Sequence, residues 1–457
     1  MRLQRTRDMD MCSGPVFMKI LRFSLPIMAM NFLQLIFNAA DMIVVGRFSG
    51  SEALAAVGAT GALINLIINT FMGLSVGTSV VVAQDYGARD WRGVNRSVHT
   101  SILLSAVGGV AVMLIGLFFS SPMLRMMGTP DDILDLANIY MIIIFIGVPA
   151  SMIYNFGAAV LRAVGDSRHP MYYLIITGAI NVVLNMIFVI VFHWNVVGVA
   201  LATIISQYIS VVLIIVCLMR SDGAIQLSLR HLCIDKEKTL RIVKIGLPAG
   251  LQSALFSVSN VLIQSAINSF GSTLIAANSA SGNIEGLIGT TMNAFSNAAI
   301  TFVGQNMGAK KYTRIDRVAK CCTVLVFATW IILGAVILIF GEPLLMIYTA
   351  DPAVVELGMI RMRVMMVVYF SCGIMNVFPG LTRGMGFSML PMFCTLIGCC
   401  VMRIVWLVTA FAWYPTVMVL FMCYPVTWSI AAVGQVISYF YARKKVFARG
   451  DMVPDEA

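Results

Sequence analysis

The chain has 457 residues, of which 59% are hydrophobic and only 11% are charged, and its mean hydropathy is +0.90. A soluble domain usually carries about 25% charged residues, so this composition excludes a water-soluble globular protein and indicates a membrane protein. The net charge of +10 does not indicate a nucleic-acid-binding protein, because no basic stripe interleaved with aromatic residues occurs in the sequence.

Apolar runs of membrane-spanning length recur from near Phe23 to near Tyr439. A helix needs roughly 20 apolar residues to cross a hydrocarbon core of about 30 Å. Hydropathy and turn residues predict six helices in the first half of the chain, at 17–45, 54–83, 98–119, 138–161, 171–192 and 197–219. They predict six more in the second half, at 245–270, 274–303, 322–340, 359–381, 391–411 and 416–440. We therefore expect an all-α integral membrane protein with twelve transmembrane helices.

The basic residues are distributed unequally between the two sides of the predicted membrane. Most of the 31 Lys and Arg residues fall at the termini and in alternate loops, whereas the opposite loops hold only Arg47 and Arg125. The positive-inside rule assigns the basic side to the cytoplasm, so both termini are expected there. The first apolar run is too long for a signal peptide and no cleavage site follows it, so we expect it to be retained.

An internal repeat relates the two halves of the chain. The segment from Val82 to Arg89, VAQDYGAR, aligns with VGQNMGAK from Val303 to Lys310, which begins 221 residues later. Arg162, Gly165, Ser167 and Pro170 recur at the same offset as Arg383, Gly386, Ser388 and Pro391, as do Asn155 and Asn376. Each copy contains six predicted helices, so both copies face the same way in the membrane.

This parallel repeat predicts two lobes related by a pseudo-two-fold axis along the membrane normal, an arrangement that suits alternating access. The expected domains are a cytoplasmic N-terminus at 1–16, an N-lobe at 17–219, a cytoplasmic interlobe linker at 220–244, a C-lobe at 245–440 and a cytoplasmic tail at 441–457.

Polar residues share one face of the first predicted helix, where Asn31, Gln34, Asn38 and Asp41 follow at intervals of three, four and three. An ionisable group inside a membrane costs roughly 2.5 to 3.5 kcal/mol on insertion scales, so Asp41 indicates a function. Removal from water favours the protonated or ion-bound form of a carboxylate, which suits Asp41 to cation exchange. The alternative is that Asp41 lies near the outer boundary and is solvated beside Arg47.

Two further helices of the first lobe carry polar pairs, Asn181 with Asn185 and Thr203 with Gln207, each at i and i+4. Their oxygen atoms would complete a cage around a cation held by Asp41. Alternatively, they form interhelical hydrogen bonds that only stabilise the bundle.

The second lobe lacks a carboxylate at the position that corresponds to Asp41. Its polar stripe on the seventh helix includes Asn260 and Gln264, and Glu285 is its deeply placed acid. Glu285 would attract a cationic substrate or move a proton; alternatively, it is a core acid paired with an amide or with a basic residue such as Arg403. Asn155 and Asn376 are further candidates for the substrate cavity, and Pro26 is a candidate hinge in the helix that carries Asp41.

The sequence resembles the multidrug and toxic compound extrusion (MATE) transporters, and within them the DinF-like branch, over nearly the whole chain. The resemblance is carried by Leu25-Pro26, by the segments 38–41 and 55–58, by the loops 84–87 and 305–308, and by the motifs that begin at Arg162 and Arg383. It implies V-shaped lobes and a cation or proton site formed by Asp41, Asn181, Thr203 and position 185. DinF-like relatives often carry a second acid where this chain has Asn185, which leaves one charge fewer here.

We therefore expect a secondary active antiporter of a bacterial plasma (inner) membrane that exports small organic cations in exchange for H⁺ or Na⁺. A bound Na⁺ would lie at Asp41, Asn181, Asn185 and Thr203, with Gln34, Asn38 and Gln207 as a supporting polar stripe. We expect a monomer in the lipid bilayer with no cofactor besides the coupling ion, no nucleic-acid partner and no enzymatic activity.

Two other functions remain open on the sequence. A flippase for lipids or lipid-linked sugars would need a lateral opening and a richer set of cavity arginines, whereas Arg162 and Arg383 lie at predicted cytoplasmic ends of helices. A membrane-embedded enzyme would need clustered His, Asp or Cys near an interface, but the four histidines are far apart in the sequence. No ATPase signature occurs, so the energy source is expected to be an ion gradient.

Overall fold

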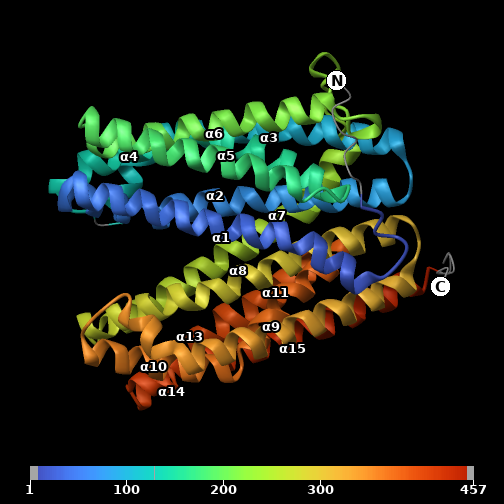
Figure 1. Ribbon diagram of the computed structural model, residues 1–457. Coiled ribbons are helices and arrows are strands. Elements are labelled where there is room, and N and C mark those ends of the chain that lie inside the picture. The colour runs from blue at the N-terminus through green and yellow to red at the C-terminus, as the bar shows by residue number, and fades with distance from the viewer. Residues whose placement is uncertain (1–8, 128, 450–457) are drawn as a thin grey trace. The chain divides into compact units, whose positions relative to one another are not determined.

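The structure is a computed structural model that describes residues 9–127 and 129–449 (Figure 1). Across these residues the chain forms helices and turns and contains no strand, which confirms the expected all-α class. The predicted residues 1–8 of the N-terminus and 450–457 of the tail lie outside this part of the chain. The first half contains α1 (Val16–Phe48), α2 (Gly50–Gly87), α3 (Trp91–Met126), α4 (Asp131–Ala163), α5 (Arg168–Asn185), the π-helix η1 (Met186–Val191) and α6 (Asn195–Arg220).

The second half begins with two short 3₁₀ turns, η2 (Gly223–Ile225) and η3 (Leu229–His231). Its helices are α7 (Lys236–Asn268), α8 (Ser272–Gly308), α9 (Tyr312–Met346), α10 (Pro352–Val367), α11 (Tyr369–Gly384), α12 (Met389–Thr395), the π-helix η4 (Leu396–Val401), α13 (Met402–Val408), α14 (Ala410–Trp413) and α15 (Val417–Phe447).

The helices account for the twelve expected spans. Within the described residues, 10 helices are long and apolar enough to cross a membrane, and the bent pair of α10 and α11 makes 11. Helix α8 has 37 residues and covers the predicted span at 274–303, although it is not apolar enough to count among these helices. The chain is therefore a multi-pass membrane protein.

Several predicted helix boundaries were wrong by more than one turn. Helix α7 begins at Lys236 rather than at 245, and α9 begins at Tyr312 rather than at 322. Hydropathy marks the part of a helix that lies in hydrocarbon, whereas the helical hydrogen bonds continue into charged residues beyond it. As a result, the last part of the predicted linker, 236–244, is the first part of α7.

The chain forms two compact units that do not coincide with a simple division at the linker. Unit 1 comprises Met1–Asp10 and Ala29–Gly250, and unit 2 comprises Met11–Met28 and Leu251–Ala457. Helices α1 and α7 therefore each belong to both units. In both helices the division falls two residues after a proline, Pro26 in α1 and Pro248 in α7.

In unit 1, α4 packs against α2, α3 and α6 (Figure 1). The first part of α7 approaches α2 so closely that glycine is required on both helices. A Cβ atom on Gly73 would lie 2.1 Å from the backbone nitrogen of Gly250, and one on Gly77 would lie 2.2 Å from the carbonyl oxygen of Ile242. Gly73 and Gly77 on α2, and Gly246 and Gly250 on α7, form two GxxxG motifs, which permit such close packing in membranes.

The repeated loop at the end of α2 fixes the start of α7 within unit 1. Asp85 is buried and accepts hydrogen bonds from Ser97 Oγ and Lys238 Nζ, both at 2.7 Å, and Arg241 Nη1 lies 3.6 Å away. Gln84 Oε1 accepts a further bond from Arg241 at 2.9 Å. Asp85 therefore joins α2, α3 and α7.

The second copy of the loop performs the corresponding task within unit 2. Asn306, the residue that aligns with Asp85, donates to the carbonyl oxygen of Met11 at 3.1 Å. The buried Arg314 donates to the same oxygen at 3.2 Å and also bonds to the carbonyls of Ser13 and Gly14. The two loops thus hold the chain at the starts of α7 and α1.

Asp85→Asn is expected to lower the thermal unfolding temperature of the purified protein. The substitution leaves Lys238 buried with reduced charge compensation, which costs about 3 kcal/mol or more. Arg96→Gln is the control, because Arg96 is 64% exposed and lies 3.7 Å from Asp235, and such a surface pair contributes little. Equal unfolding temperatures for Asp85→Asn and Arg96→Gln would show that Asp85 does not anchor α7.

In unit 2, α11 packs against α8, α9 and α15 (Figure 1). Helices α10 and α11 meet at an angle of 54° on either side of Val368. The indole nitrogen of Trp330 donates to the carbonyl of Met366 at 2.6 Å, so a side chain binds a backbone group at the break. Directly after it, the hydroxyl of Tyr369 donates to the backbone carbonyl of Glu285 at 3.1 Å.

Candidate functional site

The polar residues predicted for the cation site form one hydrogen-bonded chain in unit 1. Asn185 Nδ2 donates to the Asp41 carboxylate and also lies 3.5 Å from Asn181 Oδ1. Asn181 Nδ2 in turn lies 3.5 Å from Thr203 Oγ1, which donates to the carbonyl of Val199 at 2.9 Å. Three helices, α1, α5 and α6, supply these side chains. The i and i+4 spacing places both amides on the face of α5 that meets Asp41.

Within the described part of the chain, one buried oxygen of this network, Oδ1 of Asn185, has no hydrogen-bond partner. Asn185 is 1% exposed and its Oδ1 atom is unpaired, whereas Asp41 is half-buried. The apolar residues Val45, Val189 and Val196 form a buried cluster in unit 1, and Tyr140 packs against it. An unpaired buried acceptor beside a carboxylate is a position at which a bound cation gains ligands.

The local backbone contributes to this geometry. The regular α5 ends at Asn185, and the π-helix η1 follows immediately. Single π-turns inside helices occur frequently at functional sites, where they redirect side chains. No proline or glycine within residues 185–191 signals the turn, so it was not predicted from the sequence.

The atoms present fit a proton or a hard monovalent cation. Asp41 supplies the carboxylate oxygens, and Asn181, Asn185 and Thr203 supply neutral oxygens. Among the described residues, no group of three or more His, Cys, Asp or Glu side chains could hold a metal ion. A single charge with neutral oxygens is suited to a monovalent ion and offers few charges for a divalent one.

The other first-lobe candidates lie outside this chain of hydrogen bonds. Gln34 and Asn38 have exposed side chains, and the amide oxygen of Gln207 lies close to Gly147 of α4. Asn155 donates to the carbonyl of Ser151 at 2.7 Å, and its counterpart Asn376 donates to that of Cys372 at 2.9 Å. Both asparagines therefore bond to their own helix.

Glu285 is a paired core acid. It is 4% exposed, and Arg361 Nη2 on α10 donates to its Oε2 atom at 2.9 Å. The expectation of a basic partner was right in kind, but Arg403 was the wrong residue. Arg361 also donates to the carbonyl of Asn278 at 2.5 Å, and Asn278 Nδ2 donates to Gln264 Oε1 at 3.0 Å. The candidate Gln264 thus belongs to the same network as Glu285.

Arg403 is instead bound by neutral groups. Its Nη1 atom donates to Ser259 Oγ at 3.1 Å and to Asn260 Oδ1 at 2.6 Å, so Asn260 holds a guanidinium group. Arg403 follows the π-helix η4 by two residues. From the sequence, Arg403 was expected only as a partner for Glu285, and the ion pair with Arg361 was not predicted.

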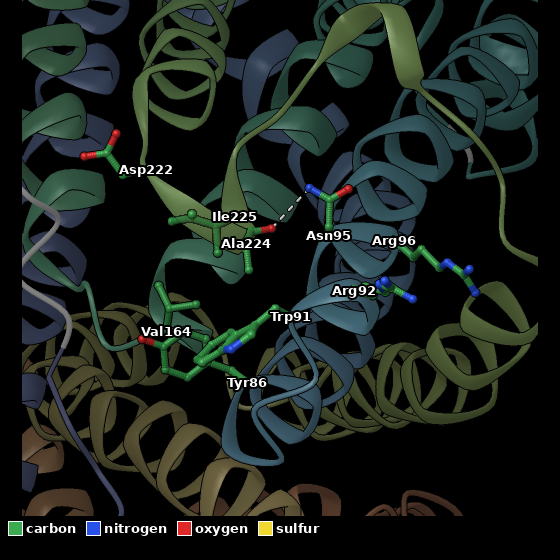
Figure 2. A pocket seen from close by; sticks show the side chains of 10 residues that line it. Tyr86, Trp91, Arg92, Asn95, Arg96, Val164, Asp222, Ala224 and Ile225 are labelled. Atoms are coloured by element: carbon green, nitrogen blue, oxygen red, sulfur yellow. Dashed lines mark hydrogen bonds between the residues drawn. The ribbon is translucent and has the colours of Figure 1, made fainter.

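A pocket beside the linker in unit 1 is unsuited to organic cations. It has a volume of about 750 Å³ and is lined by Trp91, Arg92, Asn95, Arg96 and residues 222–225 of the linker, among others. Figure 2 shows Tyr86 and Trp91 on one side of the pocket, Arg92 and Arg96 on another, and Asn95 pointing toward the linker, where it donates to the Ala224 carbonyl at 3.3 Å. Arg92 and Arg96 line this pocket beside a single carboxylate, that of Asp222, so its basic side chains outnumber its acidic ones and it is not our candidate transport site.

Comparison with known proteins identifies one family twice along the chain. The family model MatE matches residues 26–187 and again residues 248–409. The second match begins and ends 222 residues after the first, which supports the internal repeat independently of our alignment of the two loops.

Relatives and solved structures agree with this match. The chain is 27% identical to the probable multidrug resistance protein YpnP of Bacillus subtilis, with 86% of this chain and 88% of that protein covered. It is 23% identical to the multidrug export protein MepA of Staphylococcus aureus, with 82% of each covered. The fold matches the outward-facing structure of a multidrug resistance MATE family transporter with a TM-score of 0.89, at 23% identity, covering 98% of this chain and 100% of that one.

Proposed function

Because this chain belongs to the MatE family of transporters, we propose that it is a secondary active multidrug efflux antiporter, which exports small organic cations in exchange for H⁺ or Na⁺ by alternating access. Family membership makes it a transporter rather than an enzyme. Relatives from two bacteria bear the names multidrug resistance and multidrug export protein, which supports organic molecules as substrates.

The observation that supports ion coupling most strongly is the hydrogen-bonded chain from Asp41 through Asn185 and Asn181 to Thr203. Asp41 is its only ionisable member, so it would carry the charge of the coupling ion. A Na⁺ ion would take its ligands from the Asp41 carboxylate, the unpaired Asn185 Oδ1 and the oxygens of Asn181 and Thr203. A proton would bind to Asp41 itself.

Coupling requires that the ion and the drug bind the two orientations of the transporter with different affinities, since equal affinities shift no population. We propose that loading of Asp41 changes the preferred orientation through α1. Pro26 would serve as the hinge, because it precedes the point at which α1 passes from unit 2 to unit 1. Gln34, Asn38, Gln207, Asn155 and Asn376 remain proposed contributors to the ion and substrate paths.

We place the protein in a bacterial plasma (inner) membrane, with the predicted lobes at 17–219 and 245–440, the linker at 220–244 and both termini in the cytoplasm. The basic residues at both ends of the sequence support this orientation. We propose that it acts as a monomer.

Efflux from cells tests the proposed function. Expression in a bacterium that lacks its major drug pumps is expected to lower the accumulation of ethidium, a fluorescent organic cation. Collapse of the membrane ion gradients with an ionophore should restore accumulation. If accumulation equals that of vector-only cells both before and after the ionophore is added, the proposed export of organic cations is wrong.

A further inference from the structure

Glu285, Arg361 and Arg403 form a buried polar cluster in unit 2, and this cluster carries an excess of positive charge. Arg361 and Glu285 form an ion pair at 2.9 Å, which leaves this pair neutral. Arg403 is 0% exposed, and its hydrogen-bond partners Ser259 and Asn260 are uncharged. The cluster therefore has a net charge of +1.

Unpaired donors gather in the same place. Among the described side chains, the buried Nε and Nη2 atoms of Arg403, Nε of Arg361 and Nε1 of Trp428 have no hydrogen-bond partner. All three residues surround the ring of Tyr424. The guanidinium carbons of Arg403 and Arg361 lie 5.0 and 5.9 Å from its centroid, and the Trp428 ring lies 5.6 Å from it. The unpaired acceptors nearby are Glu285 Oε1 and Asn278 Oδ1, so donors outnumber acceptors.

The cluster cannot relieve this excess by losing a proton, because arginine stays protonated in proteins. The rings of Phe256 and Tyr424, whose centroids lie 5.2 and 5.0 Å from the guanidinium carbon of Arg403, stabilise the positive charge. They do not accept the Nε and Nη2 hydrogen bonds in the manner of an oxygen atom. A buried charge without a counter-ion is costly, so a bound anion would stabilise this arrangement.

The unpaired edge of the Arg403 guanidinium group indicates which kind of anion would bind there. Its Nη1 atom is occupied by Ser259 and Asn260, whereas Nε and Nη2 form the side-on edge of the guanidinium group. Two parallel N–H groups at this edge match the two oxygens of a carboxylate. Asn260 has an exposed side chain, so Arg403 lies one side chain below the surface of unit 2.

From these observations we propose that unit 2 contains a carboxylate-binding site at Arg403, beside Tyr424, Arg361 and Trp428. The carboxylate belongs either to a free organic anion or to a transported zwitterion. The binding step does not depend on the proposed efflux function, and it can be measured without transport.

Benzoate and its neutral isostere benzamide test the site in the full-length protein purified in nanodiscs, in chloride buffer at constant ionic strength. Benzoate is expected to raise the thermal unfolding temperature of the wild type in a saturable manner, and benzamide is not. Arg403→Met should lose this response and should unfold no lower than the wild type in the absence of benzoate, because it removes a buried unpaired charge. A protein that responds equally to benzoate and benzamide contradicts the proposal.

Arg403→Lys covers the case in which the methionine variant does not fold. Lysine keeps the charge but lacks the two-pronged edge, so the benzoate Kd should rise at least about tenfold. Arg443→Met is the matched control, because Arg443 is bound to Asp316 outside the cluster, and its response to benzoate should equal that of the wild type. A wild-type benzoate Kd in Arg403→Lys would overturn the proposal.

A comparison of substrates identifies the source of the carboxylate. If it belongs to the transported molecule, Arg403→Lys should reduce efflux of a zwitterionic quinolone carboxylate and leave efflux of ethidium unchanged. If both fall equally, or neither falls, the benzoate response is assigned to a free anion. A failure of all efflux with an intact benzoate response would contradict the proposed function and leave the site standing.

Discussion

Asp41→Asn is expected to reduce gradient-driven efflux of ethidium to the level of cells without the transporter. Asparagine has nearly the shape of aspartate, so the bond with Asn185 can be kept while the charge is lost. Without a charge, the site neither attracts a cation nor takes up a proton in the physiological range. The coupling ion then no longer distinguishes the two orientations, and the gradient performs no work.

The control for this variant is Asp351→Asn, the same chemical change at an exposed helix cap. Asp351 accepts the backbone hydrogen bond of Ala353 at 2.9 Å, and asparagine caps helices about as well as aspartate. Efflux by Asp351→Asn should match the wild type. Size-exclusion profiles of both variants establish that they fold, and wild-type efflux by a folded Asp41→Asn protein would refute the role of Asp41.

Gly73→Ala is expected to destabilise the protein strongly. The added methyl group would lie 2.1 Å from the backbone nitrogen and 2.2 Å from the Cα atom of Gly250, well inside van der Waals contact. Backbone atoms cannot move aside as a side chain does, so α2 and α7 must separate. We expect a loss of about 3 kcal/mol or more and a much lower yield of folded protein.

Gly58→Ala on the same helix is the matched control, because a Cβ atom there meets nothing within 4 Å. Alanine favours a helix over glycine by about 1 kcal/mol, so this variant should be as stable as the wild type or slightly more stable. The comparison is made by thermal unfolding of both proteins in detergent. An unfolding temperature for Gly73→Ala equal to that of Gly58→Ala would show that α2 and α7 do not pack this closely.

The arrangement of the first-unit site could be predicted because it depends on regular spacing. Asn181 and Asn185 lie one helical turn apart, and a polar atom in a membrane-spanning helix needs a polar partner. The family resemblance implied the same site, formed by Asp41, Asn181, Thr203 and position 185. The π-turn after Asn185 was not predictable, because no residue type marks the change from α to π hydrogen bonding.

In the polar cluster of unit 2, the pairing of the charged residues could not be predicted from the sequence. Glu285 was recognised as a deep acid, but its partner depends on which faces of α8 and α10 meet, and spacing along one helix does not determine this. Arg361 also lies seven residues before the break at Val368, which hydropathy did not reveal.

The repeated loops show a third kind of result, in which a motif was found but its role was not. Asp85 and Asn306 were aligned as parts of a repeat. Their partners, Lys238 and Met11, lie 153 and 295 residues away, and contacts between such distant segments follow only from the folded chain. The same holds for the division of α1 and α7 between the two units.

The most direct test of the central claim is ethidium transport by the purified protein in liposomes, under an imposed Na⁺ gradient or an imposed proton gradient. We predict that one of these gradients drives transport against the ethidium gradient, and that Asp41→Asn abolishes this response. Transport that proceeds at the same rate with and without both gradients would contradict ion-coupled antiport by this protein.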